Sequence, residues 1–300
     1  MTGEIQGILS ELQAGDKKAL ARAITLVEND LPGYEDILLN LESPAHTPII
    51  GITGPPGAGK STLVNSLISV LLQKSIKGIG VISIDPSSPI NNGAILGDRV
   101  RMNEHFNNKQ VFIRSLATRG TLGGLSAKTI EITELMRSAG FDYILVETAG
   151  VGQSEVEIAG LADITLLVLT PEAGDEIQAM KSGIMEIADI FVVNKADRDG
   201  ADEFSKNLYQ TMPLKSGKNK DIEVIKTVAT QNEGIENLAN SINKHLQHKQ
   251  PSEKSKLLAE KAYRLILKKR MEDISKEKLK QEIEKEPGNS FNLSRFVSTY

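Results

Sequence analysis

The sequence has no cysteine, no long apolar run and no secretion signal. Without cysteine, disulfide bonds and cysteine-based metal sites are excluded. No stretch approaches the ~18 consecutive apolar residues of a membrane-spanning helix. The N-terminus, Met1-Thr2-Gly3-Glu4, lacks the basic and then apolar segments of a signal peptide. We therefore expect a soluble cytoplasmic protein that does not bind membranes.

Neither sign of charge dominates the 300 residues. The 39 acidic and 35 basic side chains give a net charge of −4 at pH 7, with the two signs mixed along the chain. A general nucleic-acid binder would carry a concentrated basic surface, so we expect no nucleic-acid partner. The hydrophobic content of 40% is enough for a substantial core.

The stretch Gly-Pro-Pro-Gly-Ala-Gly-Lys-Ser-Thr, at 54–62, matches the phosphate-binding pattern G-x-x-x-x-G-K-[ST]. An apolar run precedes it and apolar residues at helical spacing follow it, as the required strand, loop and helix would. Loop N–H groups and the helix N-terminus attract phosphate, but Pro55 and Pro56 have no N–H to donate. The predicted donors are Gly57, Ala58, Gly59, Lys60 and Ser61, and the predicted nucleotide-binding set adds Gly54 and Thr62. Lys60 is expected to reach the β- and γ-phosphates, and the Ser61 hydroxyl to bind Mg²⁺.

Short apolar runs alternate with helical patterns after the first 46 residues. The strand candidates are 48–54, 79–85, 111–117, 142–148, 163–170, 190–195 and 223–229. This alternation predicts an α/β fold of the P-loop NTPase type, with a mostly parallel sheet flanked by helices. We expect a helical N-terminal extension at 1–46, the nucleotide domain at 47–249, and a helical C-terminal arm at 250–300.

Both extensions carry amphipathic patterns. The N-terminal stripes comprise Ile5, Ile8, Leu9 and Leu12, and then Leu20, Ala23, Ile24 and Val27. They indicate helices that pack on the main domain, with docking of a partner as the alternative. In the arm, Leu258, Ala262 and Leu265 share one face. That narrow stripe on a charged helix favours a helix–helix contact, such as one with a second subunit, over a deep core.

Acidic residues stand at or after the ends of the strand candidates, where a bound phosphate and its metal would lie. Asp85 ends the second candidate, and Asp98 follows in a polar loop; a turn or helix cap is the alternative for each. Glu147-Thr148-Ala149-Gly150 resembles the acid-x-x-Gly sensor of Mg²⁺ and γ-phosphate, with Glu in place of the usual Asp. The predicted metal ligands are thus Ser61, Asp85, Asp98 and Glu147, and the predicted catalytic residues are Lys60, Asp85, Glu147 and Gly150.

Hydrolysis is expected to be slow without help from a partner. Val151 occupies the position where some GTPases keep a water-orienting glutamine, and Gln153 comes two residues later.

The base is expected to be guanine. Asn194-Lys195-Ala196-Asp197 fits N-K-x-D at a strand end. A carboxylate at Asp197 accepts from guanine N1–H and its 2-amino group, whereas adenine would leave it unpaired, a mismatch of ~10⁴-fold or more. A turn at 228–230, comprising Val228, Ala229 and Thr230, is expected to contact the base through its backbone. The predicted ligands are GTP or GDP with Mg²⁺.

Taken as a set, these motifs resemble those of the MeaB/ArgK-type GTPases associated with methylmalonyl-CoA mutase. The resemblance covers about residues 8–200 and rests on segments 15–28, 54–62, 85–88, 97–102, 119–125, 147–155 and 194–197. It departs at Ala149, where valine is expected, and in the loosely matching turn at Val228.

The resemblance implies a homodimeric GTPase that serves as chaperone to an adenosylcobalamin-dependent mutase. Such a protein gates the loading of intact cofactor and protects the mutase from inactivation. The resemblance also implies that Gln178 and Lys181 lie in a switch segment that communicates with the mutase.

Three other functions use a similar fold. A nickel-enzyme metallochaperone usually carries Cys and His ligands, but the four histidines here are scattered. A small-molecule kinase, the label given to transport-system members of the family, would need a phosphoacceptor site that the sequence does not show. A membrane-targeting GTPase would need a methionine-rich apolar module, which the seven methionines do not form.

Overall fold

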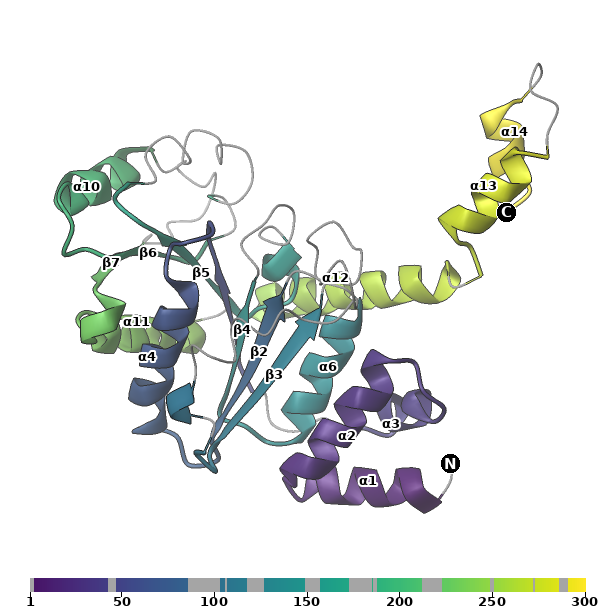
Figure 1. Cartoon of the computed structure of the whole chain (residues 1–300), viewed down its shortest axis with the longest axis horizontal. Helices are drawn as coiled ribbons and strands as arrows, with labels where there is room; N and C mark the ends of the chain where they lie inside the picture. Colours follow the sequence, from purple (N-terminus) through teal and green to yellow (C-terminus); the bar gives the residue numbers. More distant parts are fainter. Residues whose placement is uncertain are drawn as a thin grey trace. The chain divides into compact units, whose positions relative to one another are not determined.

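The computed structural model describes residues 3–42, 47–85, 103–105, 107–117, 127–148, 157–172, 185, 188–211, 223–248, 251–271, 273–285 and 291–300. Two compact units divide the chain, at 1–257 and 258–300. The first unit contains the sheet and the helices packed on it (Figure 1).

All seven predicted strands are present. They are β1 (Ile49–Thr53), β2 (Ile79–Asp85), β3 (Val111–Ala117), β4 (Tyr143–Glu147), β5 (Ile164–Leu169), β6 (Ile190–Asn194) and β7 (Glu223–Thr227). Every pairing is parallel, in the order β3-β2-β4-β1-β5-β6-β7. The α/β prediction is confirmed. The central position of β1 puts the loop that follows it in the middle of the carboxyl edge, where such sheets bind ligands.

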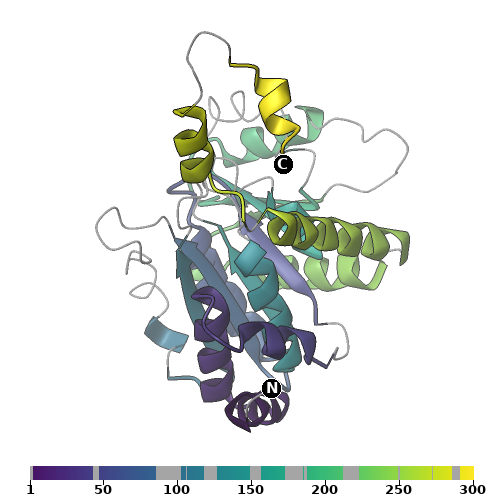
Figure 2. The same cartoon turned by 90° about the vertical axis from the view of Figure 1, so that its right-hand side faces the viewer.

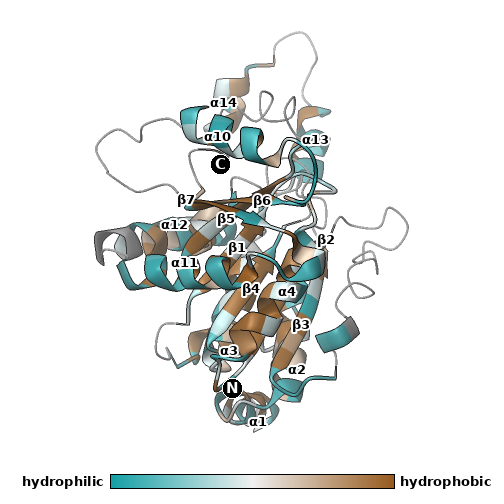
Figure 3. Ribbon diagram, turned by 90° about the vertical axis from the view of Figure 1, so that its left-hand side faces the viewer, coloured by the Kyte–Doolittle hydropathy of each residue, from teal (hydrophilic) through white to brown (hydrophobic). Residues whose placement is uncertain are grey.

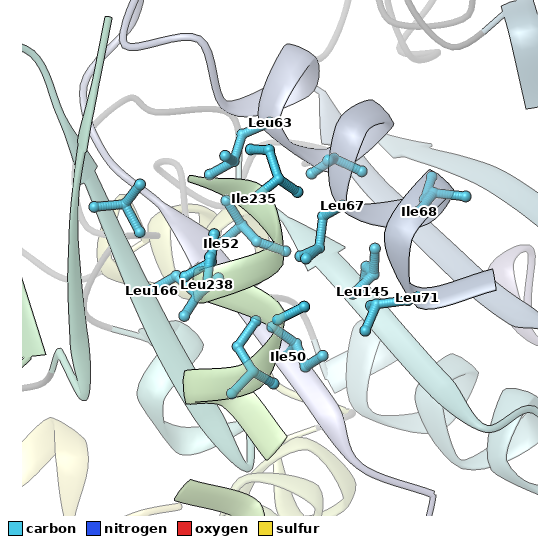
Figure 4. Close-up of a cluster of buried hydrophobic side chains, with 14 of the residues drawn as sticks. Ile50, Ile52, Leu63, Leu67, Ile68, Leu71, Leu145, Leu166, Ile235 and Leu238 are labelled. Carbon is cyan, nitrogen blue, oxygen red and sulfur yellow. The ribbon is translucent and has the colours of Figure 1, made fainter. Parts of the chain in front are cut away.

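The central strands are apolar along their length because both faces of the sheet are covered. Every residue of β1, β5 and β6 is buried, and Figure 3 shows these strands as the hydrophobic centre of the fold. On one face, α4 (Lys60–Leu72) and α11 (Ile235–His248) enclose a continuous apolar core (Figure 4). Fully burying one such Leu or Ile side chain contributes about 1.5–3 kcal/mol.

The opposite face is covered by α6 (Ala127–Ser138) and α10 (Ala201–Thr211). Phe204 and Leu208 of α10 pack on Phe191 and on alternate residues of β5. At Gly80 of β2, a Cβ would lie 2.2 Å from the terminal methyl, Cε, of Met136 in α6, so a larger residue here would require the Met136 side chain to shift.

Three helices form the N-terminal extension: α1 (Gly3–Gln13), α2 (Lys17–Glu28) and α3 (Tyr34–Leu39). The two predicted apolar stripes on α1 and α2 are buried, and α2 packs on α6, as Figures 1 and 2 show. Asp16 caps α2 by accepting a hydrogen bond from Ala19 N at 2.7 Å. Arg114 of β3 pairs with Glu28 at 2.5 Å, which joins the extension to the edge of the sheet.

The C-terminal helices are α12 (Pro251–Arg270), α13 (Lys276–Ile283) and α14 (Leu293–Val297). Phe296 packs against Phe291 and Tyr300 with tilted rings, at interplanar angles of 51° and 59° and with ring centroids 5.6 Å apart in each pair. The predicted stripe on α12 is largely exposed, since Leu258 is 59% exposed and Leu265 is only partly buried. Within the described part of the chain, no helix is long and apolar enough to cross a membrane.

Three aspartates fasten the amino edge of the sheet, and each stands one residue before a strand. Asp163, before β5, accepts from Ile49 N at 2.8 Å, and Asp189, before β6, accepts from Thr165 N at 2.9 Å. Asp142, before β4, accepts from Ile76 N and Lys77 N and from the Ser75 hydroxyl, each at 2.7 Å. Each carboxylate thus fixes the start of a neighbouring strand or the turn leading into it.

Candidate nucleotide-binding site

The glycine loop between β1 and α4 has the backbone that a phosphate-binding loop needs. Gly54, Gly57 and Gly59 have positive φ angles of 143°, 78° and 87°, which side chains disfavour. At Gly54 a Cβ would lie 2.1 Å from the Val168 carbonyl oxygen of β5. Gly59 is the N-cap of α4, so the positive end of this helix meets the loop.

Lys60 begins α4 and folds back over the loop. Its ammonium group is buried and donates to the carbonyl oxygens of Gly54 at 2.9 Å and of Pro55 at 3.1 Å. The positive charge is thereby held at the predicted phosphate position.

Ser61 meets Glu147 across the carboxyl ends of β1 and β4. The Ser61 hydroxyl donates to Glu147 Oε1 at 2.7 Å, and both side chains are buried. Hydroxyl and carboxylate oxygens are the ligands that Mg²⁺ prefers, so this pair fits that ion. Two further predicted metal acids cannot be placed beside it: the backbone of Asp85 ends β2, but its side chain lies outside the described residues, as does Asp98.

The hydroxyl groups of Thr53 and Thr148 make a second link between β1 and β4. Thr148 donates to Thr53 Oγ1 at 3.0 Å, and both residues are buried. Thr148 N also donates to the Ile52 carbonyl at 3.0 Å. The residue after Glu147 is therefore fixed to the strand that enters the glycine loop. Sequence reasoning assigned no role to either threonine. A hydroxyl residue at the end of each of two strand candidates could have indicated a hydrogen bond between them.

Asn194, at the end of β6, joins three parts of the site. Its Nδ2 donates to the Ala58 carbonyl of the glycine loop at 2.9 Å. Its Oδ1 accepts from Thr227 Oγ1 at 3.1 Å and from Ala229 N at 3.2 Å. The asparagine of N-K-x-D thus holds the phosphate loop and the predicted base turn together.

Lys195 strengthens the same connection. It has a left-handed φ of 57° and donates from Nζ to the Gly57 carbonyl at 2.8 Å. Asp197, the predicted base reader, is exposed beyond the strand end, where its carboxylate is accessible to a ligand.

An ion pair next to Asp197 joins the segments that follow β5 and β6. Arg198 donates to Glu172 at 2.6 Å. This hydrogen bond, with the nearby guanidinium charge, lowers the pKa of the Glu172 carboxyl. The predicted switch residues Gln178 and Lys181 come later in the chain and lie outside the described residues, as does Gly150.

The predicted turn after β7 is a short 3₁₀ helix, η3 (Ala229–Gln231). Val228 and Ala229 are buried, whereas Thr230 is exposed. Ser66 of α4, to which sequence reasoning assigned no role, donates to the Ala229 carbonyl at 2.7 Å. A serine between the apolar residues Val64 and Leu67 on the buried side of the helix was the available signal.

The described residues contain no group of three or more His, Asp and Glu side chains able to hold a metal ion. His245 and His248, the one close pair of histidines, each place Nδ1 by a backbone carbonyl of α11. This geometry gives no support to a nickel site in the described part of the chain.

Proteins with similar sequences occur in archaea, bacteria and a nematode. A protein of Pyrococcus abyssi named as a GTPase is 46% identical over 246 residues, covering 80% of this chain and 76% of its own. The GTPase ArgK of Escherichia coli is 41% identical over 196 residues, or 64% of this chain and 59% of its own. A methylmalonic aciduria type A homolog of Caenorhabditis elegans is 37% identical over 210 residues, covering 65% and 53% of the two chains.

Among solved structures, a LAO/AO transport system kinase superposes with a TM-score of 0.66 at 23% identity, covering 100% of this chain and 97% of its own. The hydrogenase maturation factor HypB of Archaeoglobus fulgidus gives 0.51 at 18% identity, covering 75% and 99%. These likenesses show the fold. The family model described as methylmalonyl-CoA mutase-associated GTPase MeaB matches residues 20–285. With a glycine loop, a Ser61–Glu147 pair and an N-K-x-D motif assembled at one edge of a parallel sheet, the chain belongs to the MeaB family of P-loop GTPases.

Proposed function

We propose that the protein hydrolyses GTP to GDP and phosphate with Mg²⁺. The observation that carries this proposal is the direct connection of the two motifs: Asn194 and Lys195 of N-K-x-D donate to the loop carbonyls of Ala58 and Gly57. A base held beside Asp197 and a phosphate chain held by Lys60 would then belong to one ligand. Relatives that are named as GTPases support the same reaction.

Different residues of the chain are proposed to bind the phosphates and the metal ion. The loop N–H groups and the Lys60 ammonium bind and neutralise phosphate, and Ser61 with Glu147 would hold Mg²⁺, together with the predicted Asp85 and Asp98. Bound Mg²⁺ supplies positive charge at the phosphate oxygens. Gly150 is proposed to donate its N–H to the γ-phosphate. Hydrolysis by the isolated protein is proposed to be slow, because Val151 stands where a water-orienting glutamine would.

The biological role that we propose is that of a chaperone for an adenosylcobalamin-dependent mutase of the methylmalonyl-CoA type. It would gate cofactor loading and protect the mutase, working as a cytoplasmic homodimer. The family's description and the name of the Caenorhabditis elegans relative support a link to methylmalonyl-CoA metabolism. Gln178 and Lys181 are the residues proposed to communicate with the mutase.

Base selectivity tests the nucleotide assignment. Wild-type protein should bind GDP far more tightly than ADP, measured by titration calorimetry with Mg²⁺. Asp197→Asn should weaken GDP binding by at least about tenfold and favour xanthosine diphosphate, whose 2-oxygen accepts from an amide. Exposed Asp199 offers a matched control, because Asp199→Asn removes the same charge two residues away. Unchanged GDP affinity in Asp197→Asn would end the assignment.

The partner is tested separately. Tagged protein loaded with GDP or with a non-hydrolysable GTP analogue is used to capture proteins from the source cell, and the bound fraction is scored for a cobalamin enzyme by absorbance and mass spectrometry. Nucleotide-dependent recovery of a cobalamin mutase is the expected result. Its absence in both states would contradict the chaperone role and leave the GTPase assignment intact.

A further inference from the structure

Ser66 is a buried hydroxyl that connects the helix after the glycine loop to the turn after β7. It lies on α4, and its side chain donates to the Ala229 carbonyl at 2.7 Å. The residue is only 5% exposed. A polar side chain buried to this extent normally has a hydrogen-bond partner, and here the partner belongs to the predicted base-contacting turn.

The hydrogen bond fixes the direction of a backbone donor. In a planar trans peptide, the carbonyl of Ala229 and the N–H of Thr230 point in opposite directions. Asn232 N also donates to this carbonyl, at the longer distance of 3.4 Å. Because the shorter bond from Ser66 holds the carbonyl toward α4, the Thr230 N–H is turned away from that helix. No hydrogen bond from this N–H is found within the described part of the chain, and Thr230 is exposed.

The neighbouring donor of the turn is already used. Ala229 N donates to Asn194 Oδ1 at 3.2 Å. Of these two successive N–H groups, the one from Thr230 is therefore ready to meet a ligand. Guanine carries an acceptor, O6, at the position where adenine carries an amino group, so a fixed N–H favours guanine.

We propose that Ser66 is a positioning residue for base selectivity, holding the 229–230 peptide so that the Thr230 N–H meets the purine 6-oxygen. This inference rests on the proposed guanine-nucleotide function and adds a second determinant to Asp197. It also connects base recognition to α4, whose first residues bind phosphate.

The test compares Ser66→Ala with wild type for four ligands in the presence of Mg²⁺. GDP and inosine diphosphate both carry the 6-oxygen, 2,6-diaminopurine riboside diphosphate carries a 6-amino group, and pyrophosphate has no base. Loss of one buried hydrogen bond should raise the Kd for GDP and for inosine diphosphate by about fivefold each. The Kd for the other two should stay within about twofold of wild type.

Ser69→Ala is the matched control. Ser69 lies one turn further along α4, and its hydroxyl lies 3.3 Å from the Asn65 carbonyl and 3.3 Å from His105 Nε2. Neither contact involves the turn after β7, so GDP affinity should not change. Thermal unfolding without nucleotide checks that both variants fold. Equal weakening of GDP and pyrophosphate, or unchanged GDP affinity, would overturn the role of Ser66. Wild-type protein without preference for GDP over ADP would overturn the proposed function as well.

Discussion

Gly57 and Gly59 of the phosphate loop differ in one respect that alanine substitution can measure. Both have left-handed backbones, with φ of 78° and 87°. A Cβ on Gly57 would meet nothing within 4 Å, whereas a Cβ on Gly59 would lie 2.4 Å from Asn194 Nδ2. Nδ2 cannot move away freely, because it donates to the Ala58 carbonyl.

The expected free energies follow from these contacts. An L-residue in the left-handed region costs about 1–2 kcal/mol, and both variants carry this cost. Gly59→Ala must also displace the Asn194 amide and lose its hydrogen bond, which adds about 1 kcal/mol. We therefore expect Gly57→Ala to lower the free energy of unfolding by about 1–2 kcal/mol and Gly59→Ala by about 2–3 kcal/mol.

Urea denaturation without nucleotide, followed by circular dichroism, measures both values. In an Asn194→Ala background the obstructing amide is gone, so the cost of Gly59→Ala should fall to that of Gly57→Ala. Equal costs for the two glycine variants in the wild-type background, or no coupling with Asn194, would refute the reasoning.

Three further outcomes are expected. Burial opposes ionisation of Asp142, but hydrogen bonds from the Lys77 N–H and the Ser75 hydroxyl outweigh it and hold the pKa of its carboxyl below the ordinary 3.8. The ionised carboxylate therefore stabilises the fold fully at pH values above 3.8, and this stabilisation is lost as the pH falls through the pKa of the folded state. Asp142→Asn should lower the free energy of unfolding by about 1 kcal/mol at pH 7 and by less in acid. Urea denaturation at a series of pH values measures this difference. Arg137→Ala breaks a buried ion pair with Asp163, 3.0 Å apart, and should lower the free energy of unfolding by about 3–5 kcal/mol. Chemical denaturation measures this loss, and a value as small as that for an exposed ion pair would contradict the prediction. Lys60→Ala should abolish GTP turnover in a phosphate-release assay while the far-ultraviolet circular dichroism stays unchanged, and retained turnover would remove Lys60 from the proposed chemistry.

The sequence predicts the strands well because their environment is uniform. Runs such as 164–169 and 190–194 are apolar along their length, and the sheet buries both of their faces. The apolar stripes likewise predict α1 and α2 correctly, because one face of each helix is buried in the core. The short helices α3 and α14 lie within the two predicted helical extensions, but five or six residues give too little periodicity to delimit them individually.

The candidate site is predictable where a motif fixes both the residue type and its place at a strand end. Lys60, Ser61, Glu147 and Asn194 lie at one edge of the sheet, as their positions at or just after the ends of strand candidates indicated. The contacts between motifs are not predictable in this way. Ser66 reaches Ala229, 163 positions further along the chain, and such a pairing depends on the order of the strands, which no local pattern contains.

The positions of the three aspartates that precede β4, β5 and β6 affect which substitutions this protein can accept during evolution. Their carboxylates secure one rim of the sheet, while phosphate and base groups are gathered at the other. The carboxylates that secure the strand starts are therefore distinct from the side chains gathered at the nucleotide edge. Mutations selected at the aspartate rim could raise the melting temperature without altering nucleotide affinity, and evolution could remodel the loops above Asn194 without shifting strand alignment.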